Sequence, residues 1–166
     1  MFKIEHRAIL IQSLGEKSVV KVLLAEGNLK IRSLLKSLVE TREDFRVCGE
    51  AKDGVEAISQ TVKLKPDVVV LDFAMNGLNG LQVGAQLSKT FPEIGIILHT
   101  FHAFEEMISQ AKKAGIQEVV SKGAHGGALL EAIERCSKKK PQPTTLSTPD
   151  ISIEDEGQPK GPPQVE

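Results

Sequence analysis

The feature that most constrains the fold is a regular alternation of short apolar runs with amphipathic stretches between residues 19 and 135. Each apolar run is followed by apolar residues at helical spacing, for example at Ile31, Leu34, Leu35, Leu38 and Val39. The five apolar runs are 19–24, 45–51, 67–72, 94–100 and 118–121. Near-continuous apolar strands that alternate with helices predict a parallel sheet covered on both faces.

Five such strand–helix units predict a three-layer α/β fold with a doubly wound, five-stranded parallel sheet of flavodoxin-like order 2-1-3-4-5. The helix boundaries carry their own signals. Asn28 is placed to cap the first helix, and Asp53 with Glu56 predicts a capping box for the second. Pro66 is expected to end that second helix.

The length of 166 residues fits one domain with modest extensions. Six of the eight prolines lie at or after Pro141, among polar and acidic residues with few large apolar side chains. Such a segment cannot bury enough surface to offset the entropy of ordering. We therefore expect an N-terminal extension at 1–17, a folded domain at 18–138 and a Pro-rich, disordered tail at 139–166.

Charge and cysteine content narrow the class of protein further. The formal net charge of -1 gives no electrostatic reason to expect direct nucleic-acid or membrane binding. No apolar stretch is long enough to cross a bilayer, and the N-terminal apolar run is too short for a signal peptide. Cys48 and Cys136 lie far apart, without metal-ligand spacing, which is typical of free thiols in a reducing compartment. The expected location is cytoplasmic.

Polar residues at four strand ends define the candidate site. Asp72 closes the run 67–72, and Glu26 follows the first strand, which is the neighbour of the third in the predicted order. Thr100 and Lys122 end the fourth and fifth strands. Two carboxylates are suited to hold Mg²⁺, while a lysine and a hydroxyl are suited to hold phosphoryl oxygens. The pattern predicts a phosphoryl-transfer site.

Asp72, the loop 75–80, Thr100, Ala114-Gly115 and Lys122 together resemble the receiver domain of bacterial two-component response regulators. The resemblance spans about 19–135, and this segment is most similar to receivers that precede LuxR-type output domains. The folded domain at 18–138 would therefore be the receiver. No folded output domain is expected after it, so the resemblance implies a stand-alone regulator in a phosphorelay.

The resemblance implies that Asp72 is the phosphoacceptor. It would receive its phosphoryl group from a sensor histidine kinase or a phosphotransfer protein. Mg²⁺ would be held by Glu26, Asp72 and the backbone carbonyl of Ala74. Lys122 would pair with the phosphoryl group and Thr100 would turn inward to bond it. The signal would pass by contact to a downstream protein target, with the receiver as a monomer or weak homodimer.

Three positions depart from the family pattern. Ala25-Glu26 stands where two adjacent acidic residues are usual, which predicts weakened Mg²⁺ affinity. Asn76 replaces the usual proline after the loop methionine, and Val119 occupies the aromatic switch position of the fifth strand. An alternative follows from these departures: an atypical receiver that acts as a phosphorylation-independent protein-interaction module.

Enzymes built on the same architecture fit the sequence less well. A haloacid-dehalogenase-type phosphatase would need an aspartate at Ala74, and a P-loop nucleotidase would need a Gly-x-x-x-x-Gly-Lys sequence after a strand, which the chain lacks. A flavodoxin would need a phosphate-binding loop where Glu26 stands. His99 and His102 flank Thr100 without a nucleophile elbow, so we expect packing or surface roles for them. The protein is not expected to be an enzyme.

Overall fold

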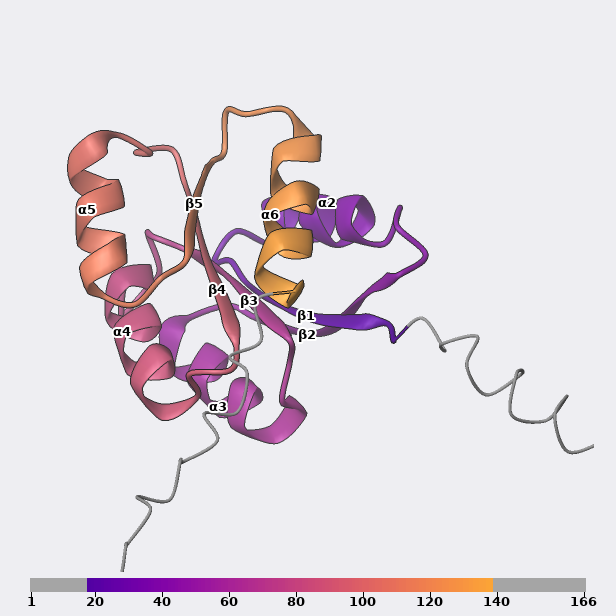
Figure 1. The fold of residues 1–166 in the computed structure, drawn as a ribbon, viewed down its shortest axis with the longest axis horizontal. Coiled ribbons are helices and arrows are strands. Elements are labelled where there is room, and N and C mark those ends of the chain that lie inside the picture. The colour runs from indigo at the N-terminus through magenta and orange to yellow at the C-terminus, as the bar shows by residue number, and fades with distance from the viewer. Residues whose placement is uncertain (1–17, 139–166) are drawn as a thin grey trace, which may run out of the picture.

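The structure, a computed structural model, describes residues 18–138. Five strands alternate with five helices in the predicted order (Figure 1). The strands are β1 (Val20–Ala25), β2 (Phe45–Ala51), β3 (Val68–Asp72), β4 (Gly95–Thr100) and β5 (Glu118–Ser121). The helices are α2 (Leu29–Val39), α3 (Gly54–Leu64), α4 (Gly80–Thr90), α5 (Glu105–Lys113) and α6 (Gly126–Lys138).

The strands form one sheet in the order β2-β1-β3-β4-β5, and every neighbouring pair is parallel. The prediction of a doubly wound, flavodoxin-like sheet is therefore confirmed. The order reverses between β1 and β3, which pair directly in the register Ala25 to Leu71. Polar residues that follow these two strands consequently meet at one edge of the sheet.

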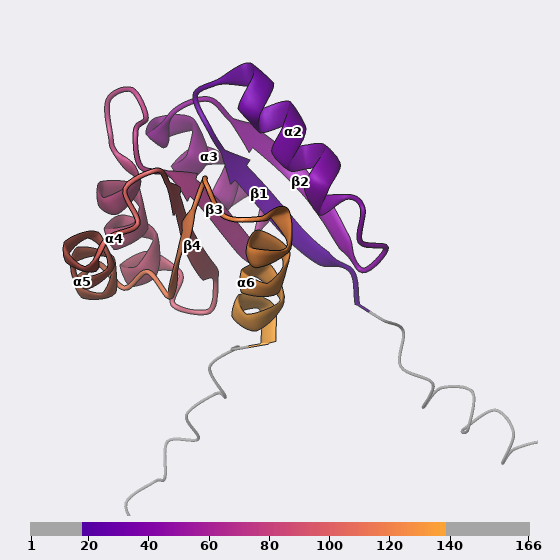
Figure 2. The same cartoon turned by 90° about the horizontal axis from the view of Figure 1, so that it is seen from above.

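Helices cover both faces of the sheet, which gives the three predicted layers (Figures 1 and 2). On one face, α3, α4 and α5 pack on a core cluster built around Leu23, Leu71 and Ile96. On the other, α2 and α6 pack on a second cluster that includes Leu24 and Ile97. β3 and β4 are buried along their whole length, because helices lie above and below them.

The helix starts follow the predicted capping chemistry in part. The Asn28 side chain accepts hydrogen bonds from the backbone N–H of Lys30 and Ile31, at 2.9 and 3.2 Å. The Asp53 side chain accepts a hydrogen bond from the backbone N–H of Glu56 at 2.8 Å. The Glu56 carboxylate accepts from the backbone N–H of Lys52, however, and not from that of Asp53. The predicted box is thus only half formed, because the carboxylate reaches one residue further back.

One apolar residue lies outside the face predicted for it. Leu34 of α2 is 70% exposed, whereas Leu35 and Val39 are buried. Each helix touches the sheet along a narrow stripe, and successive residues are about 100° apart around the axis, so Leu34 and Leu35 cannot both face the sheet. The predicted stripe was too wide.

The predicted extension at 1–17 and the predicted tail at 139–166 lie outside the described residues. Across 18–138, none of the helices is both long enough and apolar enough to cross a membrane.

Candidate functional site

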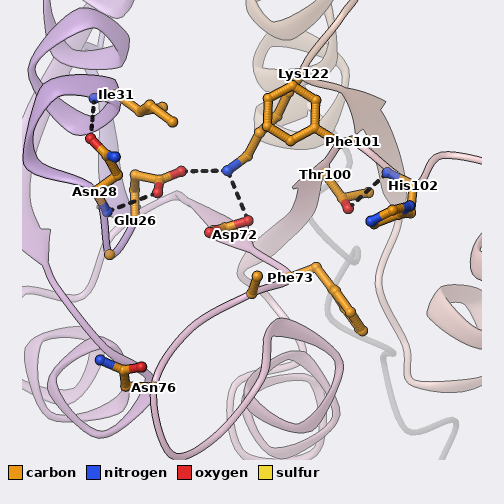
Figure 3. A pocket seen from close by; sticks show the side chains of 12 residues that line it. Glu26, Asn28, Ile31, Asp72, Phe73, Asn76, Thr100, Phe101, His102 and Lys122 are labelled. Atoms are coloured by element: carbon orange, nitrogen blue, oxygen red, sulfur yellow. Dashed lines mark hydrogen bonds and ion pairs between the residues drawn. The ribbon is translucent and has the colours of Figure 1, made fainter.

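The predicted site residues all line one pocket at the carboxyl ends of the strands (Figure 3). Asp72 is the last residue of β3 and Thr100 the last of β4, while Glu26 follows β1 and Lys122 follows β5. Ala74 lies in the loop between β3 and α4 and borders the same space. The cavity measures about 470 Å³ and opens to solvent.

Lys122 bridges the two carboxylates of the pocket (Figure 3). Its Nζ lies 2.7 Å from Glu26 Oε2 and 2.9 Å from Asp72 Oδ1. The three side chains are only 7%, 3% and 8% exposed, so these pairs are shielded from solvent. Burial by itself lowers the pKa of Lys122, but hydrogen bonds and Coulomb attraction from Glu26 and Asp72 outweigh it and raise that pKa above its usual value.

Glu26 is held by its neighbours as well as by Lys122. The backbone N–H of Asn28 donates to Glu26 Oε1 at 3.0 Å, so both oxygens of the carboxylate are engaged. Arg32 Nη1 donates to the backbone carbonyl of Glu26 at 2.6 Å, and Arg32 Nε pairs with Glu50 on β2 at 3.3 Å. The start of α2 therefore fixes both the main chain and the side chain of Glu26.

The loop after β4 forms the rim of the pocket. Thr100 is 2% exposed, and its Oγ1 accepts from the backbone N–H of His102 at 3.1 Å. Phe101 is 68% exposed, and its ring centroid lies 5.5 Å from Lys122 Nζ. A ring face at this distance attracts an ammonium group. Phe101 is thus a third neighbour of the lysine.

His99 is a buried polar residue beside the pocket. It pairs with Asp72 in the β3–β4 ladder, is 7% exposed, and its Nδ1 is the buried side-chain atom without a hydrogen-bond partner among the described residues. Burial and the positive charge of Lys122 lower the pKa of His99 to about 4, and Asp72 opposes this only in part. The imidazole is neutral at pH 7. His102, by contrast, is exposed.

The loop that follows Asp72 packs tightly against the core. Met75 is 9% exposed and belongs to the cluster under α3 and α4, while Phe73 is half-buried against it. Gly77 has φ +77°, in the left-handed region that favours glycine. The backbone N–H of Gly80 donates to the carbonyl of Phe73 at 3.1 Å, which closes the loop onto α4.

The three departures from the family pattern have definite places in the structure. Ala25 is 2% exposed and packs in the core cluster, and its methyl side chain has no oxygen that could hold a metal ion. Asn76 is exposed and lines the pocket. Val119 is half-buried against the same cluster as Ala25.

The chemistry of the donor set decides which metal the pocket suits. In 18–138 there is no group of three or more His, Cys, Asp or Glu side chains placed to hold a metal ion. Two carboxylates, Glu26 and Asp72, and the carbonyl of Ala74 are hard oxygen donors, and Mg²⁺ commonly binds one or two carboxylates together with waters and phosphate oxygens. The residues fit a partly hydrated Mg²⁺ and do not form a closed metal cage.

Two residues that shape the site were not predicted from the sequence. Arg32 lies on the first turns of α2, and nothing in its sequence context indicates a bond to the carbonyl of Glu26. Phe101 directly follows the strand-end Thr100, and its position next to that threonine was the available signal that it would lie at the rim.

A doubly wound α/β domain with a carboxylate, a lysine and a hydroxyl at its switch point has the architecture of a ligand-binding domain whose site lies at the carboxyl ends of the strands. The chain belongs to the response regulator receiver domain family, whose profile matches residues 22–134. Members of this family are phosphoacceptor domains of two-component signalling rather than enzymes. They typically bind Mg²⁺, and their phosphodonors are histidine kinases.

Known proteins from several bacteria are similar to this chain. The chemotaxis protein CheY of Listeria monocytogenes is 30% identical over 120 residues, which cover 72% of this chain and all of CheY. The response regulator VraR of Staphylococcus aureus is 27% identical over 119 residues, which cover 72% of this chain and 57% of VraR.

Solved structures show the same fold. The response regulator domain of Thermotoga maritima CheB matches with a TM-score of 0.69 and 28% identity, over 74% of this chain and 99% of that one. A LuxR-family two-component response regulator from Aurantimonas matches with a TM-score of 0.71 and 25% identity, over 74% of this chain and 88% of that one.

Proposed function

We propose that Asp72 accepts a phosphoryl group from the phosphohistidine of a sensor histidine kinase or a phosphotransfer protein. The observation that carries this proposal is the placement of the Asp72 carboxylate at the end of β3, lining an open pocket with Lys122 Nζ 2.9 Å away. A carboxylate oxygen of Asp72 would attack phosphorus. The P–N bond to the imidazole would break, its electron pair would stay on the imidazole nitrogen, and an acyl phosphate would form.

The other residues of the pocket would stabilise the transferred group. Lys122 would pair with a phosphoryl oxygen, and Thr100 would donate its hydroxyl to another once it leaves its present bond with His102. Glu26, Asp72 and the carbonyl of Ala74 would hold Mg²⁺, which when bound neutralises charge on the phosphoryl oxygens. The altered surface of β4, α5 and β5 would then be read by a downstream protein.

Intact-mass spectrometry after incubation with acetyl phosphate tests the proposal directly. The wild-type protein should gain the mass of one phosphoryl group in the presence of Mg²⁺, and Asp72→Asn should gain none. Asp53→Asn is a matched control, because Asp53 caps α3 outside the pocket and asparagine retains the capping acceptor. A folded wild-type protein that takes up no phosphoryl group from acetyl phosphate or from a histidine kinase would contradict the proposal.

A second candidate function is supported by Ala25 and Val119. The pocket has one fewer carboxylate than is usual in the family, and an aliphatic side chain stands at the aromatic position of β5. These features favour a receiver that binds its partner independently of phosphorylation. Asp72→Asn would then leave partner binding unchanged, whereas the phosphorylation-dependent function requires that the substitution alter it.

A further inference from the structure

The carboxylate residue Glu26 is followed by a glycine whose presence neither space nor backbone geometry requires. Gly27 borders the pocket, and a Cβ built on it would have the carbonyl oxygen of Lys52 as its nearest contact, at an ordinary 3.5 Å. Its φ does not lie in the left-handed region that favours glycine. Because glycine has no side chain, nothing in Gly27 itself restricts rotation of the peptide that joins it to Glu26.

Arg32 of α2 holds this peptide from outside the loop. Its Nη1 donates to the carbonyl oxygen of Glu26 at 2.6 Å, while the N–H of Glu26 donates to the carbonyl of Ala51 on β2 at 3.0 Å. Both main-chain groups of Glu26 are therefore bonded. The Arg32 side chain is only 14% exposed, and a hydrogen bond from a guanidinium is stronger than one between neutral groups.

Glu50 on β2 fixes the guanidinium in turn. Arg32 Nε lies 3.3 Å from Glu50 Oε2, and Lys36 Nζ lies 2.9 Å from Glu50 Oε1. Glu50 pairs with Leu24 in the β1–β2 ladder, so it lies beside the end of β1. Arg32 thus connects the loop after β1 to β2 through separate N–H groups of one planar side chain.

We infer that Arg32 is a positioning residue for the cation site, because it fixes the peptide after Glu26 and with it the carboxylate that would bind Mg²⁺. The Glu26 carboxylate accepts from the N–H of Asn28 at 3.0 Å, so rotation of the intervening peptides would move a donor that holds it (Figure 3). Arg32 itself does not line the pocket. This role rests on the Mg²⁺ site of the proposed function and adds to it a residue outside the pocket.

Isothermal titration of MgCl₂ into the full chain, without a phosphodonor, tests this role. Coulomb's law alone predicts that loss of the positive charge in Arg32→Gln strengthens Mg²⁺ binding. Loss of positioning predicts the opposite sign, and we expect binding to weaken about tenfold. Glu50→Gln keeps the arginine but removes the charge that holds it, so it should weaken binding by less. Mg²⁺ binding by Arg32→Gln that is as tight as in the wild type, or tighter, would overturn the inference.

Gly27→Ala offers a rescue that a merely structural role of Arg32 would not give. Alanine narrows the conformations open to the loop, so its addition to Arg32→Gln should restore about two- to fivefold of the lost Mg²⁺ affinity. Arg46→Gln is the matched control, because Arg46 is exposed on β2 and does not line the pocket. It should bind Mg²⁺ as the wild type does. A double variant that binds no more tightly than Arg32→Gln would contradict the positioning role.

Backbone NMR of the metal-free chain gives a readout that does not depend on Mg²⁺. The heteronuclear ¹H–¹⁵N NOE of Gly27 should fall in Arg32→Gln, and that of Gly115, in the loop between α5 and β5, should not. Glu50→Gln provides the same comparison if Arg32→Gln does not fold. An unchanged Gly27 NOE would overturn the inference. A wild type that binds Mg²⁺ but takes up no phosphoryl group would instead contradict the proposed function alone.

Discussion

At the scale of single residues, His99 is a buried titratable group that the proposed phosphoryl chemistry does not use. Its imidazole is 7% exposed, faces the field of Lys122, and has an Nδ1 without a hydrogen-bond partner. A buried polar atom without a partner costs about 1–3 kcal/mol. The cost is tolerated here because the group stays neutral.

The lowered pKa of His99 predicts a loss of stability in acid. The unfolded chain takes up this proton near pH 6.5, whereas the folded protein resists it until about pH 4. The unfolded state therefore binds more protons in this window, and the contribution present above pH 6.5 is lost as the pH falls towards 4. The free energy of unfolding of the wild type should fall by up to about 3 kcal/mol more than that of His99→Leu across this window.

Urea unfolding at several pH values between 7 and 4 measures this difference. His102→Leu makes the same substitution at an exposed position of the adjoining loop and serves as the control for the change of residue type. Parallel pH profiles for the wild type and His99→Leu would show that His99 does not stay neutral in the folded state.

Residue placement in the pocket was predictable where strand topology decides it. Glu26, Asp72, Thr100 and Lys122 each stand at a strand end, so the predicted sheet order alone brings them to one edge. The bridge from Lys122 to both carboxylates was not predictable, because it depends on the side-chain rotamers of the three residues. Side-chain geometry of this kind is decided by packing and has no pattern in the sequence.

At the scale of secondary-structure elements, the start of α4 packs directly against the end of β3 at Gly80. A Cβ at this position would meet the carbonyl oxygen of Asp72 well inside contact distance and would lie 2.7 Å from Leu98 Cδ1. The absence of a side chain allows the helix to begin directly against the end of β3. The position of α4 and that of Asp72 are therefore coupled.

Gly80→Ala should lower the free energy of unfolding by about 1–3 kcal/mol, because either α4 or the end of β3 must move. Alanine has a higher helix propensity than glycine by about 1 kcal/mol, so a measured loss understates the clash. Gly123→Ala is the control, since the nearest atom to its added Cβ would be Ser121 Oγ at an ordinary 3.6 Å. Equal urea midpoints for Gly80→Ala and the wild type would rule out the coupling.

The bounds of strands and helices were predicted correctly where a local sequence signal marks the end of the element. β2 and β5 have the predicted bounds, and α3 ends at Leu64, just before Pro66, as expected. β1 is shifted by one residue, to Val20–Ala25, because its ends depend on pairing with β2 and β3 rather than on local apolarity. The exposure of Leu34 was missed for a related reason: a hydrophobic period indicates a face but not how much of that face the sheet can cover.

At the scale of the whole molecule, the sheet separates two apolar clusters within 18–138, and the five helices of that range pack on one or the other. One lies under α3, α4 and α5 and the other under α2 and α6. Both clusters consist of residues between Val20 and Cys136. The alignment with Listeria CheY accounts for the whole of that protein in 120 residues, so a chain of this length is sufficient for a receiver.

These facts predict that the fragment 18–138 folds by itself, because its own residues supply both apolar clusters and a relative of 120 residues spans the same domain. The fragment should unfold in urea in one cooperative transition, with a slope of about 1–3 kcal/mol per molar urea, because the slope reports the surface exposed when a packed domain unfolds. Far-UV and near-UV circular dichroism should give the same midpoint. Two probes with different midpoints, or a broad transition without a native baseline, would contradict the prediction.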